Sequence, residues 1–361
     1  MSSAPGLPKN PAPPPRPRRL GLRHILVPAV ALAVAGLVVF ALSRLDLHAI
    51  GHDLLTASPG WVALSLLLMA LSLLCRSISW QQTLRAALPD THIAWPSVVR
   101  ATMIGVMGSA VFPGRVGEPT RVLVLARRLE GRTRHLLAVI AGTVFSQTLI
   151  NLLALAILAA VTFSSVSIFH GHEAGLAGAL AVPALICLLV LGGPSLLRLA
   201  RRSRLARVRR TAIAITRLLG LARRGLAVFT RPRHGLPAVA SQLLAWALQW
   251  GSCYMVVLAL GLQKQATPAT AAAILLAVNV SAVLPATPSN VGVFQAACLV
   301  VLAAYGVGAG PGLAYGIILQ AVEVVTALAL GAPALLAEGL SWRDIRRMPP
   351  AAPEEVTEEV V

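Results

Sequence analysis

Long apolar stretches dominate the 361-residue sequence and restrict it to very few kinds of fold. A stretch of about 18 residues with few charges can cross the roughly 30 Å hydrocarbon core of a bilayer as a helix. Inside that core every backbone polar group must be satisfied within the protein, which favours helices. The sequence therefore predicts an all-α, polytopic membrane protein. Six stretches are long enough to cross, namely 25–43, 58–75, 136–163, 175–197, 236–262 and 312–337.

Two shorter apolar stretches, 97–112 and 269–284, end at a repeated motif. Residues 109–113 (Ser-Ala-Val-Phe-Pro) return as 281–285 (Ser-Ala-Val-Leu-Pro), and a Val-Gly pair follows each copy. Each stretch makes about 24 Å of helix, which is marginal for a crossing. Proline removes a backbone donor and glycine permits sharp turns, so we expect two re-entrant broken-helix hairpins. The residues expected to shape them are Pro113, Gly114, Gly117, Pro285, Pro288 and Gly292.

The net charge of +18 comes largely from arginines that lie beside the apolar stretches. The positive-inside rule places such arginines on the cytoplasmic side, which argues against nucleic-acid binding and for membrane topology. Because arginines flank the segment 97–126 on both sides, it should enter and leave on the cytoplasmic face. Along the rest of the chain, the same rule predicts that both termini lie in the cytoplasm. The second hairpin, about 269–309, should then enter the membrane from the outer face. We expect the protein in the cell (inner) membrane.

The predicted hairpins give the chain an internal organisation. Residues 1–24 form a basic, Pro-rich cytoplasmic tail, 25–340 the transmembrane domain, and 341–361 a disordered cytoplasmic tail. Within the domain, span, hairpin and span repeat upside down, at about 58–163 and 236–337, as in transporters whose substrate site lies near the bilayer midplane. The linker 198–234 is rich in arginine, and it either only fixes the topology or lies as an amphipathic helix on the cytoplasmic leaflet.

The tip of the first hairpin carries the strongest candidate binding residues. Arg115 and Arg121 follow the proline break, and the planar, permanently charged guanidinium binds phosphate well. Glu118 could orient an arginine or meet a cationic head group. The alternative is a tight cytoplasmic turn with a local Glu–Arg pair.

The second tip and two long spans add polar candidates. Asn290 and Gln295 can donate and accept hydrogen bonds without the desolvation cost of a charge, or they serve as contacts between helices. Glu323 stands mid-span, where a charge is costly, so it is a proton-coupling site or a structural partner of Arg115 or Arg121. Gln147 and Asn151 form an i, i+4 pair in span 136–163.

No catalytic set can be assembled from the sequence, and no cofactor or metal site is expected. The four cysteines lie in apolar segments and suggest neither disulfides nor zinc. A weak external cluster could assemble a metal site, although no spacing enforces it. Its members are Asp46, His48, His52, Asp53, His170, His172 and Glu173.

The motifs Pro-Gly-Arg-x-Gly-Glu-x-x-Arg at 113–121 and Pro-x-x-Val-Gly-Val-Phe from 288 resemble the lysylphosphatidylglycerol synthase transmembrane, or flippase-like, family over most of residues 25–340. The resemblance implies a lipid substrate, since some members move aminoacylated phospholipids between leaflets and others are tied to isoprenoid-linked or hopanoid lipids. No aminoacyl-transferase domain follows the last span, so lipid aminoacylation is not expected. Where the family favours charges, this chain has neutral residues, at Gln147-Thr148, Asn151, Gln295 and Gln320.

The expected function is therefore lipid transport by a flippase that moves a phospholipid or polyprenyl-linked lipid between leaflets. Its partners would be membrane lipids with an anionic or phosphate-bearing head group, and a homo-oligomer stays open. One alternative is a membrane-embedded lipid-modifying transferase. Another is a non-transporting accessory subunit of lipid or cell-envelope synthesis.

Overall fold

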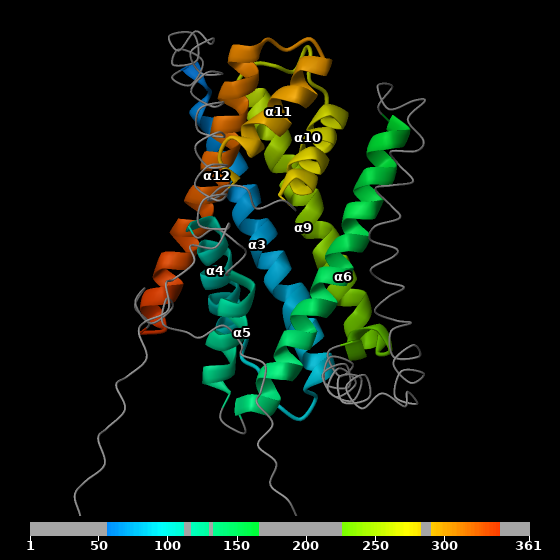
Figure 1. The fold of residues 1–361 in the computed structure, drawn as a ribbon, viewed down its shortest axis with the longest axis vertical. Coiled ribbons are helices and arrows are strands. Elements are labelled where there is room, and N and C mark those ends of the chain that lie inside the picture. Colours follow the sequence, from blue (N-terminus) through cyan, green and yellow to red (C-terminus); the bar gives the residue numbers. More distant parts are fainter. Residues whose placement is uncertain (1–55, 112–116, 130–132, 166–225, 283–289, 340–361) are drawn as a thin grey trace, which may run out of the picture. The chain divides into compact units, whose positions relative to one another are not determined.

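The computed structural model describes residues 56–111, 117–129, 133–165, 226–282 and 290–339. This part contains eight α-helices and one short 3₁₀ helix (Leu226–Phe229), with no strand among its residues (Figure 1). The predicted all-α class is therefore confirmed for the described part of the chain. The predicted spans 25–43 and 175–197, both terminal tails and most of the linker lie outside it.

Four helices are long and apolar enough to cross a membrane, and they match four of the six predicted spans. Between them lie two pairs of shorter helices, at the positions predicted for the hairpins. The long helices are α3 (Pro59–Ala87), α6 (Thr133–Ser165), α9 (Pro232–Ala259) and α12 (Ala309–Ala337). The short pairs are α4 (Trp95–Val111) with α5 (Gly117–Arg128), and α10 (Pro268–Ser281) with α11 (Val293–Ala304).

Helix α3 is longer than the sequence predicted. The predicted span ended at Cys75 because Arg76 follows, but the helix continues to Ala87. The extension is rich in polar residues, and most of these are buried against other helices. Arg76, the first of the arginines that precede the segment 97–126, is therefore an internal helical residue and not a loop charge, so it does not count toward the positive-inside topology.

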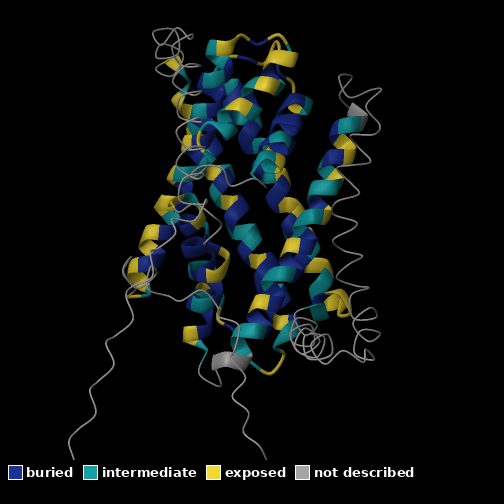
Figure 2. Ribbon diagram, viewed as in Figure 1, coloured by how far each residue is buried: buried dark blue, intermediate teal, exposed yellow. Residues whose placement is uncertain are grey.

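Helix α3 buries several polar residues and exposes several leucines, unlike a water-soluble helix; Figure 2 shows buried and exposed residues alternating along the long helices. Its serines at 65, 72, 77 and 79 are all fully buried, whereas Leu67 and Leu71 are 54% and 39% exposed. A helix with polar residues inside and apolar residues outside suits a hydrocarbon surrounding, where interhelical hydrogen bonds assist packing. The burial pattern thus supports the membrane assignment independently of hydropathy.

Helices α3 and α9 form the central antiparallel pair and are joined by three serine contacts. Ser72 Oγ donates to the Ala245 carbonyl at 2.7 Å, and Ser79 Oγ donates to the Ala238 carbonyl at 2.9 Å. Ser65 and Ser252 exchange hydroxyl-to-carbonyl bonds of 3.0 Å each. The contacts recur every seven residues: Ser65, Ser72 and Ser79 ascend along α3 while their partners Ser252, Ala245 and Ala238 descend along α9. Small side chains along this seam let the two backbones approach closely.

The two short helix pairs lie toward opposite ends of the long helices (Figure 1). In the first pair, α4 and α5 are in direct contact at Gly105 and Gly117. A Cβ added to Gly117 would fall 1.9 Å from the Gly105 carbonyl oxygen and 2.2 Å from Ser109 Oγ. Glycine is therefore required at position 117 by this close approach.

Basic residues gather at one end of the long helices. Arg85 lies in the last turn of α3, Arg127 and Arg128 in the last turn of α5, and Arg233 in the first turn of α9 (Figure 1). At the opposite end, Lys264 is the one basic residue in the described part of the chain. The described helices thus have a basic end and a nearly neutral end.

Candidate functional site

A cavity of about 330 Å³ with both apolar and polar lining residues lies where the two short helix pairs meet the long helices. Both copies of the repeated motif reach it, through Ser109 and Ala110 at the end of α4 and through Ala282 after α10. Six helices contribute residues to its wall, namely α3, α4, α9, α10, α11 and α12. Helix α11 contributes Phe294. Its polar and charged lining residues are Ser72, Arg76, Ser109, Gln249, Asn279, Asn290, Gln320 and Glu323.

The charged wall of the cavity consists of Arg76 from α3 and Glu323 from α12. The Arg76 guanidinium donates through Nη2 to Gln249 Oε1 on α9. Glu323 interacts electrostatically with Arg76 and forms a side-chain hydrogen bond with Gln249. The amide of Gln249 thus lies between a cation and a carboxylate, contacting both. The sequence had offered Arg115 or Arg121 as the structural partner of Glu323. Among the described residues Arg76 interacts electrostatically with Glu323, without a direct ion pair, and Arg115 lies outside these residues.

The neutral wall of the cavity comes from the second helix pair. Asn279 Nδ2 donates to the Leu275 carbonyl at 2.8 Å, one turn back in α10. Asn290 has a φ of 52°, in the left-handed region that asparagine tolerates better than most residues. Gln295 accepts from the backbone amide of Gly292 at 2.7 Å and donates to Gln320 Oε1. Gln295 therefore supports the cavity from behind, by fixing both the start of α11 and the side chain of Gln320.

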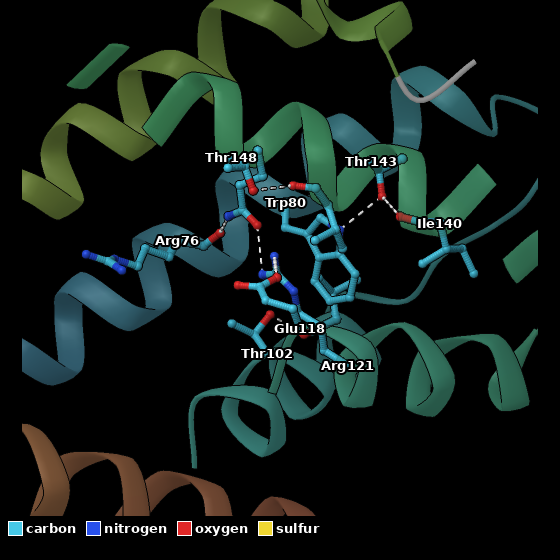
Figure 3. Close-up of polar contacts among 11 residues, drawn as sticks. Arg76, Trp80, Thr102, Glu118, Arg121, Ile140, Thr143 and Thr148 are labelled. Atoms are coloured by element: carbon cyan, nitrogen blue, oxygen red, sulfur yellow. Dashed lines mark hydrogen bonds and ion pairs between the residues drawn. The ribbon is translucent and has the colours of Figure 1, made fainter. Parts of the chain in front are cut away.

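Arg121 lies outside the cavity, in a buried cluster between α3, α5 and α6 (Figure 3). Its guanidinium carbon is 4.9 Å from the centroid of the Trp80 ring, and Nη1 donates to Gln147 Oε1 at 2.9 Å. It also pairs with Glu118, whose side chain is 50% exposed. Glu118 and Arg121 thus form a local Glu–Arg pair within α5, as the alternative to head-group binding in the sequence analysis described.

The Arg121 cluster is connected to the cavity through the backbone of α3. Gln147 Nε2 donates to the carbonyl oxygen of Arg76 at 2.8 Å, while the Arg76 side chain points away from the cluster (Figure 3). Trp80, one turn after Arg76, donates from its indole nitrogen to Thr143 Oγ1 at 3.1 Å. These contacts fix the turn of α3 that carries Arg76.

Asn151, paired with Gln147 in the sequence argument, serves a different contact. Its Oδ1 accepts hydrogen bonds from Gln242 Nε2 and from the Trp246 indole nitrogen, both at 2.9 Å. Trp246 in turn lies under Arg76, with 6.0 Å between the guanidinium carbon and the ring centroid. Asn151 therefore holds α9 against α6 and does not line the cavity.

The structure divides the predicted site residues into three groups. Asn290 and Glu323 line the cavity. Glu118, Arg121, Gln147, Asn151 and Gln295 lie behind its walls, in contacts that position helices or lining residues. Arg115 and the hairpin residues Pro113, Gly114, Pro285 and Pro288 lie outside the described residues, whereas Gly117 and Gly292 begin or precede the second helix of each pair.

Sequence reasoning missed Arg76 and Gln249 as site residues. The sequence signal that could have found Arg76 is the spacing of Ser65, Ser72 and Ser79, a seven-residue serine repeat that continues past the arginine and indicates that the helix does not end there. Arg76 lies four residues after Ser72 in α3, and Gln249 lies four residues after Ala245 in α9. Since Ser72 bonds to the Ala245 carbonyl, Arg76 and Gln249 occupy corresponding positions on the two helices. No group of three or more potential metal ligands occurs among the described residues, and the external His and Asp cluster of the sequence argument lies outside them.

Fold and site together define a class: polytopic α-helical membrane proteins with pairs of short helices around a cavity that holds one arginine and one glutamate. A family model for the lysylphosphatidylglycerol synthase TM region matches residues 25–331. The chain belongs to this family, as the sequence motifs predicted, and is thus a membrane protein related to lipid synthesis or translocation. No curated protein matches the sequence.

Proposed function

We propose that this protein is a lipid translocase of the cell membrane, which carries a phosphate-bearing lipid head group between leaflets through the cavity at Arg76 and Glu323. The observation that carries the proposal is the meeting of both interrupted helix pairs at one charged cavity. Helix interruptions at membrane depth are tolerated where they line a cavity, and in transporters they surround the substrate.

The depth of the cavity supports this function. Glu323 is fourteen residues from either end of α12. Arg76 and Gln249 are likewise internal to the long helices α3 and α9. An ionisable residue at mid-span is expensive, and in membrane proteins it usually serves a substrate or ion pathway. A head group needs such polar contacts at the position where hydrocarbon offers none.

The order and pairing of the helices support an inverted repeat. Long helix, short pair and long helix occur twice, and the contact of α4 with α12 is matched by that of α10 with α6. The repeated motif at 109–113 and 281–285 is offset by 172 residues, and the contacts Ser72–Ala245 and Arg76–Gln249 join residues 173 apart, so each of these side chains contacts the position next to its own equivalent. Such symmetry favours alternating access from the two leaflets.

The basic end of the described helices supports a cytoplasmic orientation for that end. Both termini would then lie in the cytoplasm. Arg121 contributes in this proposal as a positioning residue, because its guanidinium already contacts Glu118, Gln147 and Trp80. Arg76 replaces it as the expected phosphate ligand.

Reconstitution in vesicles tests the proposal. Purified protein is placed in vesicles that carry trace lipids with fluorescent acyl chains, and a membrane-impermeant quencher reports the lipid in the outer leaflet. We expect faster exchange between leaflets than in empty vesicles, and slower exchange in the variants Arg76→Gln and Glu323→Gln. The control is Gly60→Ala, at a position where an added Cβ meets no atom within 4 Å. Exchange equal to that of empty vesicles across a panel of head groups would reject the proposal.

No chemical conversion of the lipid is part of this proposal. The rival function, a lipid-modifying transferase, predicts that alanine at His48, His52 and His170 abolishes activity in cells while Arg76→Gln is tolerated. An accessory subunit predicts instead that cavity variants lower protein abundance but leave activity per molecule unchanged. Complementation of a strain that lacks the gene separates the three.

A further inference from the structure

The cavity presents one cation and one carboxylate to the same small space. Among the described residues that line it, Arg76 is the one base and Glu323 the one acid. The other polar lining groups are hydroxyls and amides. A cavity with this charge pattern matches a ligand that carries one positive and one negative group, because such a ligand leaves neither wall charge unpaired after desolvation.

Arg76 retains unused donor capacity. Its Nη2 is bonded to Gln249, but its buried Nε has no hydrogen-bond partner within the described part of the chain. A guanidinium presents its N–H groups as a planar fork that fits two oxygens of a phosphate. Because this Nε is buried, an acceptor with two oxygens in the cavity reaches the fork when the guanidinium turns toward it, and it then satisfies a donor that Glu323 and Gln249 leave unmet.

We propose that this cavity is a binding site for a phosphoethanolamine head group, with the phosphate on Arg76 and the primary ammonium on Glu323. The head group supplies each wall charge with a direct partner of opposite sign, which Arg76 and Glu323 do not supply to one another, because they influence each other electrostatically without forming a direct ion pair. Gln249, which contacts both residues, can follow either. The proposal rests on the proposed function only in taking the ligand to be a lipid.

Size and charge separate this head group from other lipids. The cavity volume of about 330 Å³ lies near the lower limit of ligand pockets, roughly 300–1,000 Å³, so it suits a head group and not a whole lipid. The two wall charges are linked through a single amide, which favours a ligand whose charges are few bonds apart. A head group with two ammonium groups would leave one without a carboxylate. A head group with phosphate alone would leave Glu323 unpaired.

The test measures binding separately from movement. The purified full-length chain in detergent is offered phosphatidylethanolamine, phosphatidylcholine and phosphatidylglycerol with identical acyl chains, in pairwise competition. Native mass spectrometry counts the bound lipid of each kind. We expect phosphatidylethanolamine to exceed phosphatidylglycerol by about tenfold or more, the effect of one charge-assisted hydrogen bond. Phosphatidylcholine should bind less well than phosphatidylethanolamine, because its ammonium has no N–H to donate.

Variants assign the preference to its residues. Glu323→Gln should lower phosphatidylethanolamine binding to the level of phosphatidylglycerol, and Arg76→Gln should weaken the binding of both. Glu338→Gln removes an identical charge outside the cavity and should keep the wild-type preference. Size-exclusion profiles verify that each variant is folded, and the wild-type competition needs no variant at all.

Three results would overturn the inference: equal binding of phosphatidylglycerol or phosphatidylcholine by the wild type, a preference that survives in Glu323→Gln, or no bound lipid of any kind. These outcomes are independent of the vesicle assay. Selective binding without leaflet exchange would reject the translocase and keep the site. Leaflet exchange without selective binding would keep the translocase and reject the phosphoethanolamine site.

Discussion

The contact between α4 and α5 predicts a graded response to adding one methyl group. Gly108 and Gly117 face each other across this contact, but an added Cβ has very different room at the two positions. At Gly117 it would lie 1.9 Å from the Gly105 carbonyl oxygen, whereas at Gly108 its nearest neighbour is 3.5 Å away. Gly117→Ala should therefore force the two helices apart, and Gly108→Ala should be accommodated.

The magnitude follows from the overlap. An ordinary contact begins near 3.4 Å, so α4 and α5 must separate by about 1.5 Å at this point. Overpacking of this kind costs about 1–3 kcal/mol, more than the roughly 1 kcal/mol that alanine gains over glycine in helix propensity. The displaced helix α4 carries Ser109 and Ala110 of the cavity wall, so lipid binding should weaken as well.

Thermal unfolding followed by the intrinsic fluorescence of the six tryptophans measures this series. We expect the midpoints of wild type, Gly60→Ala and Gly108→Ala to lie close together, with Gly117→Ala several degrees lower. Gly60 is the open-space control, since nothing lies within 4 Å of its added Cβ. A Gly117→Ala protein as stable as Gly108→Ala would refute the close approach of the two helices.

Three further substitutions test contacts away from the cavity. Arg121→Lys keeps the charge, but lysine cannot bond to Gln147 and Glu118 and stack on the Trp80 ring at once. We expect a loss of about 1–3 kcal/mol in unfolding free energy. Arg85→Lys, at an exposed position, is the control and should leave stability unchanged. Glu338→Gln breaks pairs with Arg100 at 3.5 Å and Arg128 at 2.7 Å. It should lower the unfolding midpoint, and salt should reduce this difference only in part because the Glu338 side chain is 5% exposed; an unchanged midpoint in low salt would contradict this account. Tyr315→Phe removes a fully buried 2.9 Å bond to the Cys253 carbonyl and should cost about 1 kcal/mol in chemical denaturation, whereas an unchanged stability would show that this bond contributes little.

Local patterns in the sequence predicted the helices well. The short apolar stretches 97–112 and 269–284 correspond to helices Trp95–Val111 and Pro268–Ser281, because a proline break and the apolar run itself define each end. The end of α3 was missed because an arginine normally stops an apolar span. The helix continues through Arg76 because Gln249, on α9 and far away in the sequence, accepts a hydrogen bond from its guanidinium inside the protein.

The pairing of polar side chains could not be predicted for a related reason. Gln147 and Asn151 lie one turn apart and read as a single site in the sequence, yet one contacts Arg121 and the other contacts Gln242 and Trp246. Which helix faces which side of α6 depends on the packing of the whole chain. Sequence spacing specifies a shared face of one helix, but not the partner across from it.

The serine seam between α3 and α9 has a consequence for biosynthesis. Ser65 bonds to Ser252, a residue 187 positions later in the chain. At about 5–20 residues per second, the ribosome needs about 10–40 s to deliver that partner. During this interval α3 has no α9 to accept its hydroxyl protons, and each serine can bond only to a carbonyl in its own preceding turn, as Ser77 does with Leu73 at 3.0 Å. The central helix pair is therefore assembled late, and nascent chains released before α9 emerges should be recognised by membrane quality control as unfinished.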